Sequence, residues 1–190
     1  TVNTAHTRGF GRVVRGPDGS VKSIVEEAAA TEQQLSIQEL NVGAYCFNAE
    51  WLWKALRKIQ VSKKGEYYLT DTISLAVMEG LTVQAVVSDD LVDTIGINTR
   101  LHLAEAEGAM RLRINQAHML AGVTIVDPAS TYIEPGVKIG RDTVIWPNSY
   151  LRGKTVIGEG CVIGPNTIAE ASKIGECCEI LAAVLDGSVV

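Results

Sequence analysis

The sequence is poor in aromatic residues and has no excess of positive charge. Of its 190 residues, 5% are aromatic, and 22 Asp and Glu residues outnumber 17 Lys and Arg residues, giving a net charge of −5 and a pI near 5.2. An acidic chain of this kind is poorly suited to bind nucleic acid or an anionic membrane surface. No apolar run reaches the roughly 20 residues that span a bilayer. We therefore expect small molecules or further copies of the chain as partners, with no nucleic acid and no membrane insertion.

Cysteine is also scarce, with four residues. Cys46, Cys161, Cys177 and Cys178 follow no metal-ligand spacing, and the two adjacent cysteines do not readily form a disulfide with each other. The first residues carry no secretory signal, so reduced thiols in a cytoplasmic protein are expected. The sequence begins without an initiator methionine and ends at Val190 within an apolar stretch, from which we expect a central fragment of a longer protein.

Apolar residues recur at every sixth position from residue 133 onward, and glycine often follows them. This period fits neither an α-helix nor the two-residue alternation of hairpins, which remain the alternative if the spacing is accidental. It is typical of a three-sided parallel β-solenoid, in which three hexads form one coil. A five-residue interval before Ile168 indicates a one-residue deletion at a corner. The expected inward residues are Ile133, Ile139, Ile145, Leu151, Ile157, Ile163, Ile168, Ile174 and Ile180.

Residues 1–98 have the composition of a mixed α/β unit. β-branched and aromatic residues between turn signals predict strands over residues 21–26, 42–47 and 83–87. Asn48 is placed to cap one helix, and Thr70 or Asp71 to open another.

A long helix is predicted over residues 100–119, where apolar residues are spaced by three or four positions. Its charged residues are most simply a solvated face, and Gly122 ends it. The expected order is an α/β domain over 1–98, a linker helix over 99–121 and the start of a left-handed parallel β-helix over 122–190.

Five short motifs occur in a fixed order ahead of the hexads. They are Gly9-Phe10-Gly11-Arg12, Ile24-Val25-Glu26, Gln38-Glu39-Leu40-Asn41-Val42-Gly43, Gly65-Glu66-Tyr67-Tyr68-Leu69-Thr70-Asp71 and Gly96-Ile97-Asn98-Thr99-Arg100. Together they resemble the bacterial bifunctional enzymes of UDP-N-acetylglucosamine synthesis, which join an N-acetylglucosamine-1-phosphate uridylyltransferase to a glucosamine-1-phosphate N-acetyltransferase. The resemblance covers nearly the whole chain. It implies that residues 1–98 are the C-terminal part of a Rossmann-like nucleotidyltransferase domain.

The resemblance also implies a site for UDP-N-acetylglucosamine. Gly11 would let its backbone approach the sugar ring, and Glu26 and Asn41 would hydrogen-bond the sugar hydroxyls and the N-acetyl group. Asn98 would supply one oxygen ligand to Mg²⁺, a hard cation that prefers oxygen, although Thr99 stands where the family usually has a second Asn. The further matches to the sugar pocket are Glu66, Tyr68 and Thr70.

Four of these residues also have a purely structural interpretation. Glu26 suits surface charge at a strand end and Asn41 suits a turn. Thr70 and Asn98 each suit the N-cap of the helix that follows. The sequence leaves both interpretations open.

The implied chemistry has two steps. Acetyl-CoA acetylates glucosamine 1-phosphate, and the product then attacks the α-phosphorus of UTP in line, releasing pyrophosphate and forming a precursor of peptidoglycan and lipopolysaccharide. The family's nucleotide-binding loop and its second metal ligand match no position here, and His6, His102 and His118 all lie outside the hexads. We therefore expect no complete catalytic site and no turnover from this chain alone. We also expect a homotrimer assembled through the β-helix.

Three alternatives stand beside this interpretation. The chain could be a non-catalytic trimeric scaffold, or part of a monofunctional sugar-1-phosphate nucleotidyltransferase with a solenoid tail. A hexad-repeat zinc enzyme of the carbonic anhydrase type would need three histidine ligands around the metal, and the hexads contain no histidine.

Overall fold

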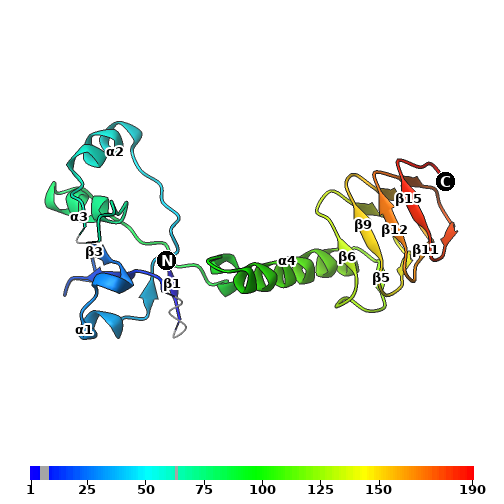
Figure 1. Cartoon of the computed structure of the whole chain (residues 1–190), viewed down its shortest axis with the longest axis horizontal. Coiled ribbons are helices and arrows are strands. Elements are labelled where there is room, and N and C mark those ends of the chain that lie inside the picture. Colours follow the sequence, from blue (N-terminus) through cyan, green and yellow to red (C-terminus); the bar gives the residue numbers. More distant parts are fainter. Residues whose placement is uncertain (5–8, 63) are drawn as a thin grey trace. The chain divides into compact units, whose positions relative to one another are not determined.

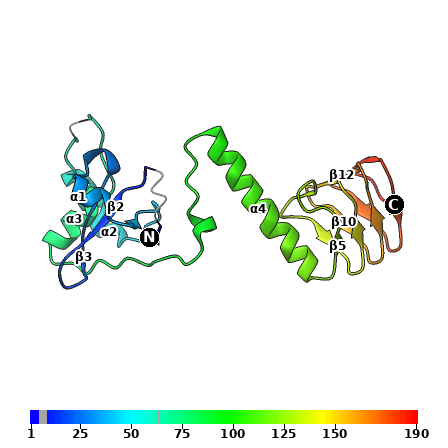
Figure 2. The same cartoon turned by 90° about the horizontal axis from the view of Figure 1, so that it is seen from below.

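The computed structural model describes residues 1–4, 9–62 and 64–190, so His6 lies outside the described residues. The chain divides into two compact units, Thr1–Gly96 and Ile97–Val190, each of which is described by itself (Figures 1 and 2). Among the described residues, no helix is both long and apolar enough to cross a membrane.

The first unit is built on a four-stranded antiparallel sheet in the order β1-β4-β2-β3. Val2 and Leu40 are buried on one stretch of this sheet, and Val13 and Ile24 lie opposite each other in the β2–β3 hairpin. The predicted strand over residues 21–26 is confirmed as β3. The strands are β1 (Val2–Asn3), β2 (Arg12–Arg15), β3 (Val21–Val25) and β4 (Glu39–Leu40).

The short helix α1 contacts β2, and α3 packs against β3. Asn48 caps α2 as predicted, since its side-chain oxygen accepts a hydrogen bond from the Trp51 N–H at 3.0 Å. The α-helices of this unit are α1 (Glu32–Leu35), α2 (Ala49–Ala55) and α3 (Asp71–Met78), and its 3₁₀ turns are η1 (Glu27–Ala29), η2 (Leu56–Lys58) and η3 (Leu91–Thr94).

The predictions of strands over residues 42–47 and 83–87 are wrong. Both segments lie outside the strands of the described part of the chain. The composition of these segments suits a sheet, but a strand also needs a neighbouring backbone with which to exchange hydrogen bonds.

A long helix, α4 (Arg100–Leu120), opens the second unit and confirms the prediction to within one residue. Thr99 is its N-cap, because the Thr99 hydroxyl accepts a hydrogen bond from the His102 N–H at 3.2 Å. The buried Asn115 side chain donates to the carbonyls of Pro128 and Thr131, at 3.0 and 3.1 Å. These two bonds tie α4 to the first coil of the domain that follows.

That domain is a three-sided parallel β-helix, in agreement with the six-residue period. Its faces are the parallel sheets β13-β10-β7, β14-β11-β8-β5 and β15-β12-β9-β6. The strands are β5 (Thr124–Ile125), β6 (Tyr132–Ile133), β7 (Lys138–Ile139), β8 (Val144–Ile145), β9 (Tyr150–Arg152), β10 (Val156–Ile157), β11 (Val162–Ile163), β12 (Ile168–Glu170), β13 (Lys173–Ile174), β14 (Glu179–Ile180) and β15 (Val184–Asp186).

One inward position differs from the prediction. Ala169 is fully buried and stacks on Leu151, whereas Ile168 pairs with Tyr150 on the outer side of β12. The six-residue spacing therefore continues through Ala169, and the short interval falls between Ala169 and Ile174. Hydrophobicity alone favoured the isoleucine, but the ladder to β9 fixes which side chain points inward.

Buried hydroxyls line the corners of the β-helix. Thr143 donates to the Gly158 carbonyl at 2.9 Å, Ser149 to the Trp146 carbonyl at 2.7 Å and Thr155 to the Arg152 carbonyl at 2.7 Å. All three residues are fully buried, so these bonds satisfy polar groups that have no access to water.

Glycine is required at one corner because successive coils meet there. A Cβ atom on Gly140 would lie 2.6 Å from the Gly158 carbonyl carbon, and one on Gly158 would lie 2.6 Å from the Gly175 carbonyl carbon. The glycines that follow aliphatic residues in the sequence thus permit close stacking of the backbone.

We expect Leu151→Ala to destabilise the β-helix by about 2–5 kcal/mol, because Leu151 is fully buried and its loss leaves a cavity. Urea unfolding followed by hydrogen exchange over residues 123–190 measures the change. Lys138→Ala is the control: Lys138 is exposed on the outer side of β7, so its truncation should change stability by less than about 0.5 kcal/mol. Equal effects of the two substitutions would contradict the assignment of the inward face.

Candidate functional site

The sheet of the first unit brings Gly11, Glu26 and Asn41 together. Gly11 and Glu26 lie just beyond the paired residues Arg12 and Val25 at the open end of the β2–β3 hairpin. The Asn41 N–H donates to the Gly11 carbonyl at 2.8 Å. A Cβ atom on Gly11 would lie 3.2 Å from the Ile24 side chain and 3.6 Å from Glu26 Oε2, so glycine keeps the space beside this carboxylate open.

Thr70 joins this group from the start of α3. The buried Thr70 hydroxyl donates to Glu26 Oε1 at 2.8 Å, and no side-chain cap bond is formed by Thr70. Thr70 is therefore the N-cap residue of α3 by position, but its side chain binds Glu26 and does not cap the helix. The bond holds the Glu26 carboxylate in place directly after the end of β3, where Glu26 is partly buried.

Asn41 lies in a turn, as its structural interpretation stated. Its Oδ1 accepts a hydrogen bond from the Gly43 N–H at 3.2 Å, and Gly43 has a φ of +77°. Burial raises the pKa of Tyr45, hydrogen bonding to the Asn41 side chain opposes that rise, and the nearby charge of Glu26 adds to it.

Glu66 and Tyr68 form a separate pair. The Tyr68 hydroxyl donates to Glu66 Oε2 at 3.1 Å, and both residues lie in the loop before α3. Within the described part of the chain, neither side chain hydrogen-bonds Gly11, Glu26 or Asn41. The structure thus brings four of the six site residues of this unit into one connected group and leaves two beside it.

Asn98 belongs to the second unit and is described only there. Its backbone N–H donates to His102 Nδ1 at 3.3 Å. Because Thr99 caps α4, the interpretation of Asn98 as that cap is wrong. Among the described residues, no hydrogen bond is donated to the Asn98 side-chain oxygen, so this oxygen is available to a ligand.

Arg12 is a structural support of the site that the sequence analysis missed. Its side chain is 2% exposed, and its guanidinium donates to the Phe10 carbonyl and, at 2.9 Å, to Glu27 Oε2. Arg12 thereby joins the backbone before Gly11 to the residue after Glu26. The sequence offered one indication of this role, because Arg12 is followed by Val13 and Val14 in a short apolar segment. A charged side chain among buried residues needs a partner of opposite charge or a hydrogen-bond acceptor.

Two family models match the chain. The nucleotidyl transferase model matches residues 1–105, and the bacterial transferase hexapeptide model of six repeats matches residues 136–171.

Curated relatives are similar over nearly the whole chain. Each is called bifunctional protein GlmU. The protein from Shouchella clausii is 44% identical over 194 residues, which cover 100% of this chain and 43% of the relative. That from Geobacillus thermodenitrificans is 48% identical over 183 residues (96% and 40%), and that from Clostridioides difficile is 42% identical over 191 residues (100% and 42%). The chain thus spans less than half the length of these relatives.

We expect Thr70→Val to destabilise the first unit by about 1 kcal/mol, because it removes the bond to Glu26 and leaves a partly buried carboxylate with one donor fewer. Denaturant-dependent amide hydrogen exchange over residues 9–62 measures the change in the first unit. Thr82→Val, at an exposed threonine, is the control and should have little effect. If the two substitutions cost the same, the Thr70–Glu26 bond does not organise the site.

Proposed function

Because the chain belongs to the nucleotidyl transferase family, we propose that its first unit carries the sugar-binding part of an N-acetylglucosamine-1-phosphate uridylyltransferase. The observation that carries this proposal is the connected group of Gly11, Glu26, Asn41 and Thr70. The parent protein would be the bifunctional enzyme that first acetylates glucosamine 1-phosphate and then forms UDP-N-acetylglucosamine. Its domains would be residues 1–98 for sugar binding, 99–121 for the linker helix and 122–190 for the start of the β-helix.

The arrangement of the group supports specific roles in binding the sugar. The Thr70 hydroxyl donates a hydrogen bond to Oε1 of Glu26. The other carboxylate oxygen, Oε2, lies beside Gly11, where no side chain fills the space. A sugar hydroxyl entering that space can donate to Oε2 without displacing Thr70. The Asn41 side chain lies beside the same backbone and would bind the N-acetyl group, and Glu66 and Tyr68 would line the outer side of the pocket.

Asn98 would hold Mg²⁺ through its side-chain oxygen, together with oxygen ligands that this chain does not supply. An amide oxygen suits this hard cation, which usually keeps several waters and substrate phosphates as ligands. No group of three His, Cys, Asp or Glu side chains is placed to hold a metal ion within the described residues. When bound, Mg²⁺ would neutralise phosphate charge during transfer.

In the proposed transfer the protein positions the two substrates and forms no covalent bond with either of them. A phosphate oxygen of N-acetylglucosamine 1-phosphate attacks the α-phosphorus of UTP, and the bond from that phosphorus to the pyrophosphate oxygen breaks. Glu26, Asn41 and Gly11 would fix the sugar so that its phosphate is aligned for attack. UTP and acetyl-CoA are substrates of the parent enzyme in this proposal.

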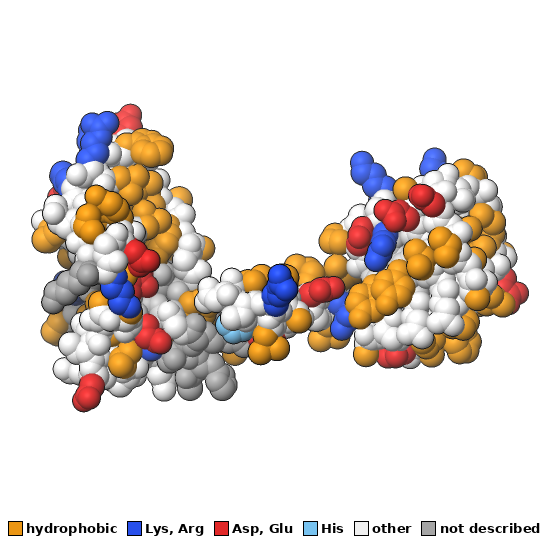
Figure 3. All heavy atoms as spheres, viewed as in Figure 1, with side chains coloured by type: hydrophobic (Ala, Val, Ile, Leu, Met, Phe, Trp, Pro, Cys, Tyr) orange, Lys and Arg blue, Asp and Glu red, His pale blue; other side chains and the backbone are white. Residues whose placement is uncertain are grey.

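The β-helix would belong to the acetyltransferase part and would assemble a homotrimer. Its match to the transferase hexapeptide model supports the first point. The second is supported by hydrophobic side chains on its outside, which include Trp146 at 42%, Leu181 at 53% and Val184 at 75% exposure. One face of the β-helix with a row of such side chains is visible in Figure 3. A soluble assembly of this type fits a cytoplasmic location.

In a longer protein that contains this sequence and both activities, we expect Asn98→Ala to lower uridylyl transfer by at least about tenfold, because it removes a metal ligand. Acetyl transfer, measured on the same sample, should stay nearly unchanged. Thr99→Asn is the matched control, since asparagine also caps helices well. Equal loss of both activities in Asn98→Ala would indicate a folding role. The chain on its own should release no pyrophosphate from UTP, Mg²⁺ and N-acetylglucosamine 1-phosphate.

At micromolar concentration, sedimentation velocity should give a mass near three times the 20.4 kDa of one chain. We expect Val184→Glu to shift this equilibrium toward the monomer, because it places a charge on an exposed apolar position of β15. Lys138→Glu, on an outward position of β7, is the control and should leave the trimer intact. A monomer for the unsubstituted chain would contradict the proposed assembly.

A further inference from the structure

His102 lies in the first turn of α4 and holds the backbone ahead of the helix at two points. Its backbone N–H donates to the Thr99 hydroxyl at 3.2 Å, and its Nδ1 accepts a hydrogen bond from the Asn98 N–H at 3.3 Å. All three residues belong to the second unit. Because Nδ1 accepts this bond, the neutral His102 ring carries its proton on Nε2. None of the groups proposed above to bind substrate or metal includes His102.

The two bonds form a capping box that is displaced by one residue. In an ordinary capping box, the side chain of the third helical residue accepts a hydrogen bond from the backbone N–H of the N-cap residue. His102 is the third residue of α4, but it accepts from Asn98, which precedes the N-cap Thr99. The ordered backbone at the start of the helix therefore extends back to Asn98.

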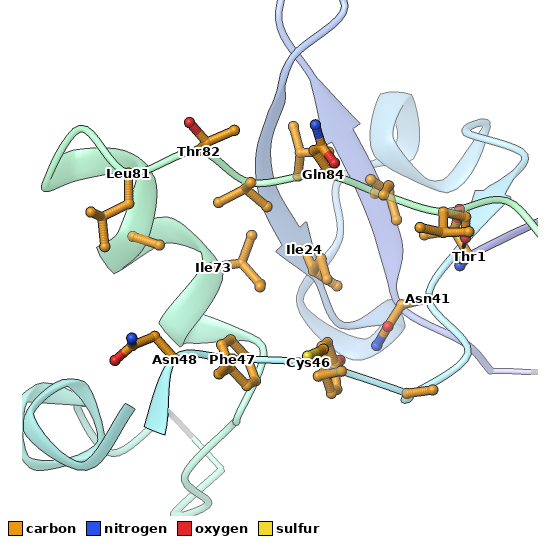
Figure 4. Close-up of a pocket in the computed structure, with 18 of the residues that line it drawn as sticks. Thr1, Ile24, Asn41, Cys46, Phe47, Asn48, Ile73, Leu81, Thr82 and Gln84 are labelled. Atoms are coloured by element: carbon orange, nitrogen blue, oxygen red, sulfur yellow. Dashed lines mark hydrogen bonds between the residues drawn. The ribbon is translucent and has the colours of Figure 1, made fainter. Parts of the chain in front are cut away.

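This displacement leaves the Asn98 side chain free. Asn41 and Asn48, which line the groove drawn in Figure 4, use their side-chain oxygens locally. Each accepts a hydrogen bond from a backbone N–H two or three positions further along the chain, at 3.2 and 3.0 Å. At Asn98 the capping bond is made by Thr99 and the backbone is held by His102. The Asn98 main chain is thus restrained while its amide oxygen remains available to a ligand.

We propose that His102 is a positioning residue for metal binding, which restrains the Asn98 main chain and so preorganises the Asn98 amide oxygen for a divalent cation. The proposal rests on the role of Asn98 as a ligand of Mg²⁺ given above. Mg²⁺ demands near-ideal octahedral geometry, and ordering a mobile ligand costs conformational entropy when the metal binds. The bond to His102 provides this order beforehand. Since Nδ1 accepts the Asn98 bond and Nε2 carries the proton, neither nitrogen is free to bind the metal itself.

A matched pair of substitutions separates this role from a simple contribution to the start of α4. Leucine and glutamine have similar helix propensities, both better than that of histidine, and both keep the backbone N–H that binds Thr99. Glutamine also keeps a side-chain acceptor, whereas leucine has none. His102→Gln and His102→Leu therefore differ in the acceptor offered to the Asn98 N–H and hardly in their tendency to form the helix.

The first measurement uses the chain as it is and needs no metal. Amide exchange at Asn98 should be about three- to tenfold faster in His102→Leu, as expected for the loss of one hydrogen bond, and close to the unsubstituted rate in His102→Gln. At a pH of about 8, where free imidazole is neutral, the ring nitrogen shifts of His102 should show a proton on Nε2 and none on Nδ1. Equal exchange in the two variants, or a proton on Nδ1, would overturn the proposal.

The second measurement uses a longer protein that contains this sequence and both activities. His102→Leu should raise the Mg²⁺ concentration at half-maximal uridylyl transfer by about three- to tenfold, and by a larger factor than it lowers the maximal rate. His102→Gln should restore the Mg²⁺ dependence. A parallel loss of uridylyl and acetyl transfer in His102→Leu would identify a folding role and overturn the proposal.

Asn98→Ala distinguishes a failure of this proposal from a failure of the one on which it rests. If Asn98→Ala leaves uridylyl transfer intact, Asn98 is not a metal ligand and both proposals are wrong. If Asn98→Ala lowers uridylyl transfer but His102→Leu leaves the Mg²⁺ dependence unchanged, only the role of His102 is wrong. Loss in Asn98→Ala together with a shifted Mg²⁺ dependence in His102→Leu supports both.

Discussion

The hydrogen-bond ladder between successive coils is the constraint on which the second unit depends. It places each residue directly above its counterpart in the previous coil, as in the stack of Ile139 on Ile157 and Ile174. Once the backbone is fixed in this way, the identity of the side chain at each place is restricted by the space around it. Aliphatic residues occupy the axis, hydroxyl residues satisfy the corner carbonyls, and glycine stands where coils meet most closely. The helix α4 is joined to the β-helix through Asn115, whose side-chain amide donates hydrogen bonds to two carbonyls of the first coil.

The sequence was most informative where structure is local. The six-residue period and the spacing of residues 100–119 predicted the β-helix and α4 correctly, because each coil or turn repeats the same contacts. It was least informative where a strand needs a distant partner. Residues 42–47 and 83–87 have the composition of strands, yet composition does not state which backbone lies beside them. The position of Ile168 illustrates the same limit on a smaller scale, since only its pairing with Tyr150 shows that Ala169 points inward.

Within the candidate site, the order of the motifs did not predict what the residues contact. Thr70 follows the pattern of a helix cap, but its hydroxyl binds Glu26 from 44 positions away in the chain. Arg12 carried too weak a signal, because an arginine in a short strand is usually exposed and only the fold reveals that it is buried beside Glu27. Both bonds connect segments that are far apart in sequence. Such hydrogen bonds hold the Glu26 and Glu27 carboxylates in place, and they cannot be predicted from the spacing of residues in the sequence.

The stacking of coils also governs which changes of chain length the second unit can absorb. Paired residues on neighbouring coils are 18 positions apart between Val144 and Val162, 17 between Val162 and Glu179, and 16 between Ile168 and Val184. The strands keep their registers through these differences, so the corners accommodate the missing residues. Loss or gain of a residue at a corner thus changes the structure only at that corner. Duplication of a whole coil gives each neighbouring coil the same contacts as before. The β-helix can therefore lengthen in evolution by repeating one coil, whereas the sheet of the first unit must place each added strand between specific neighbours.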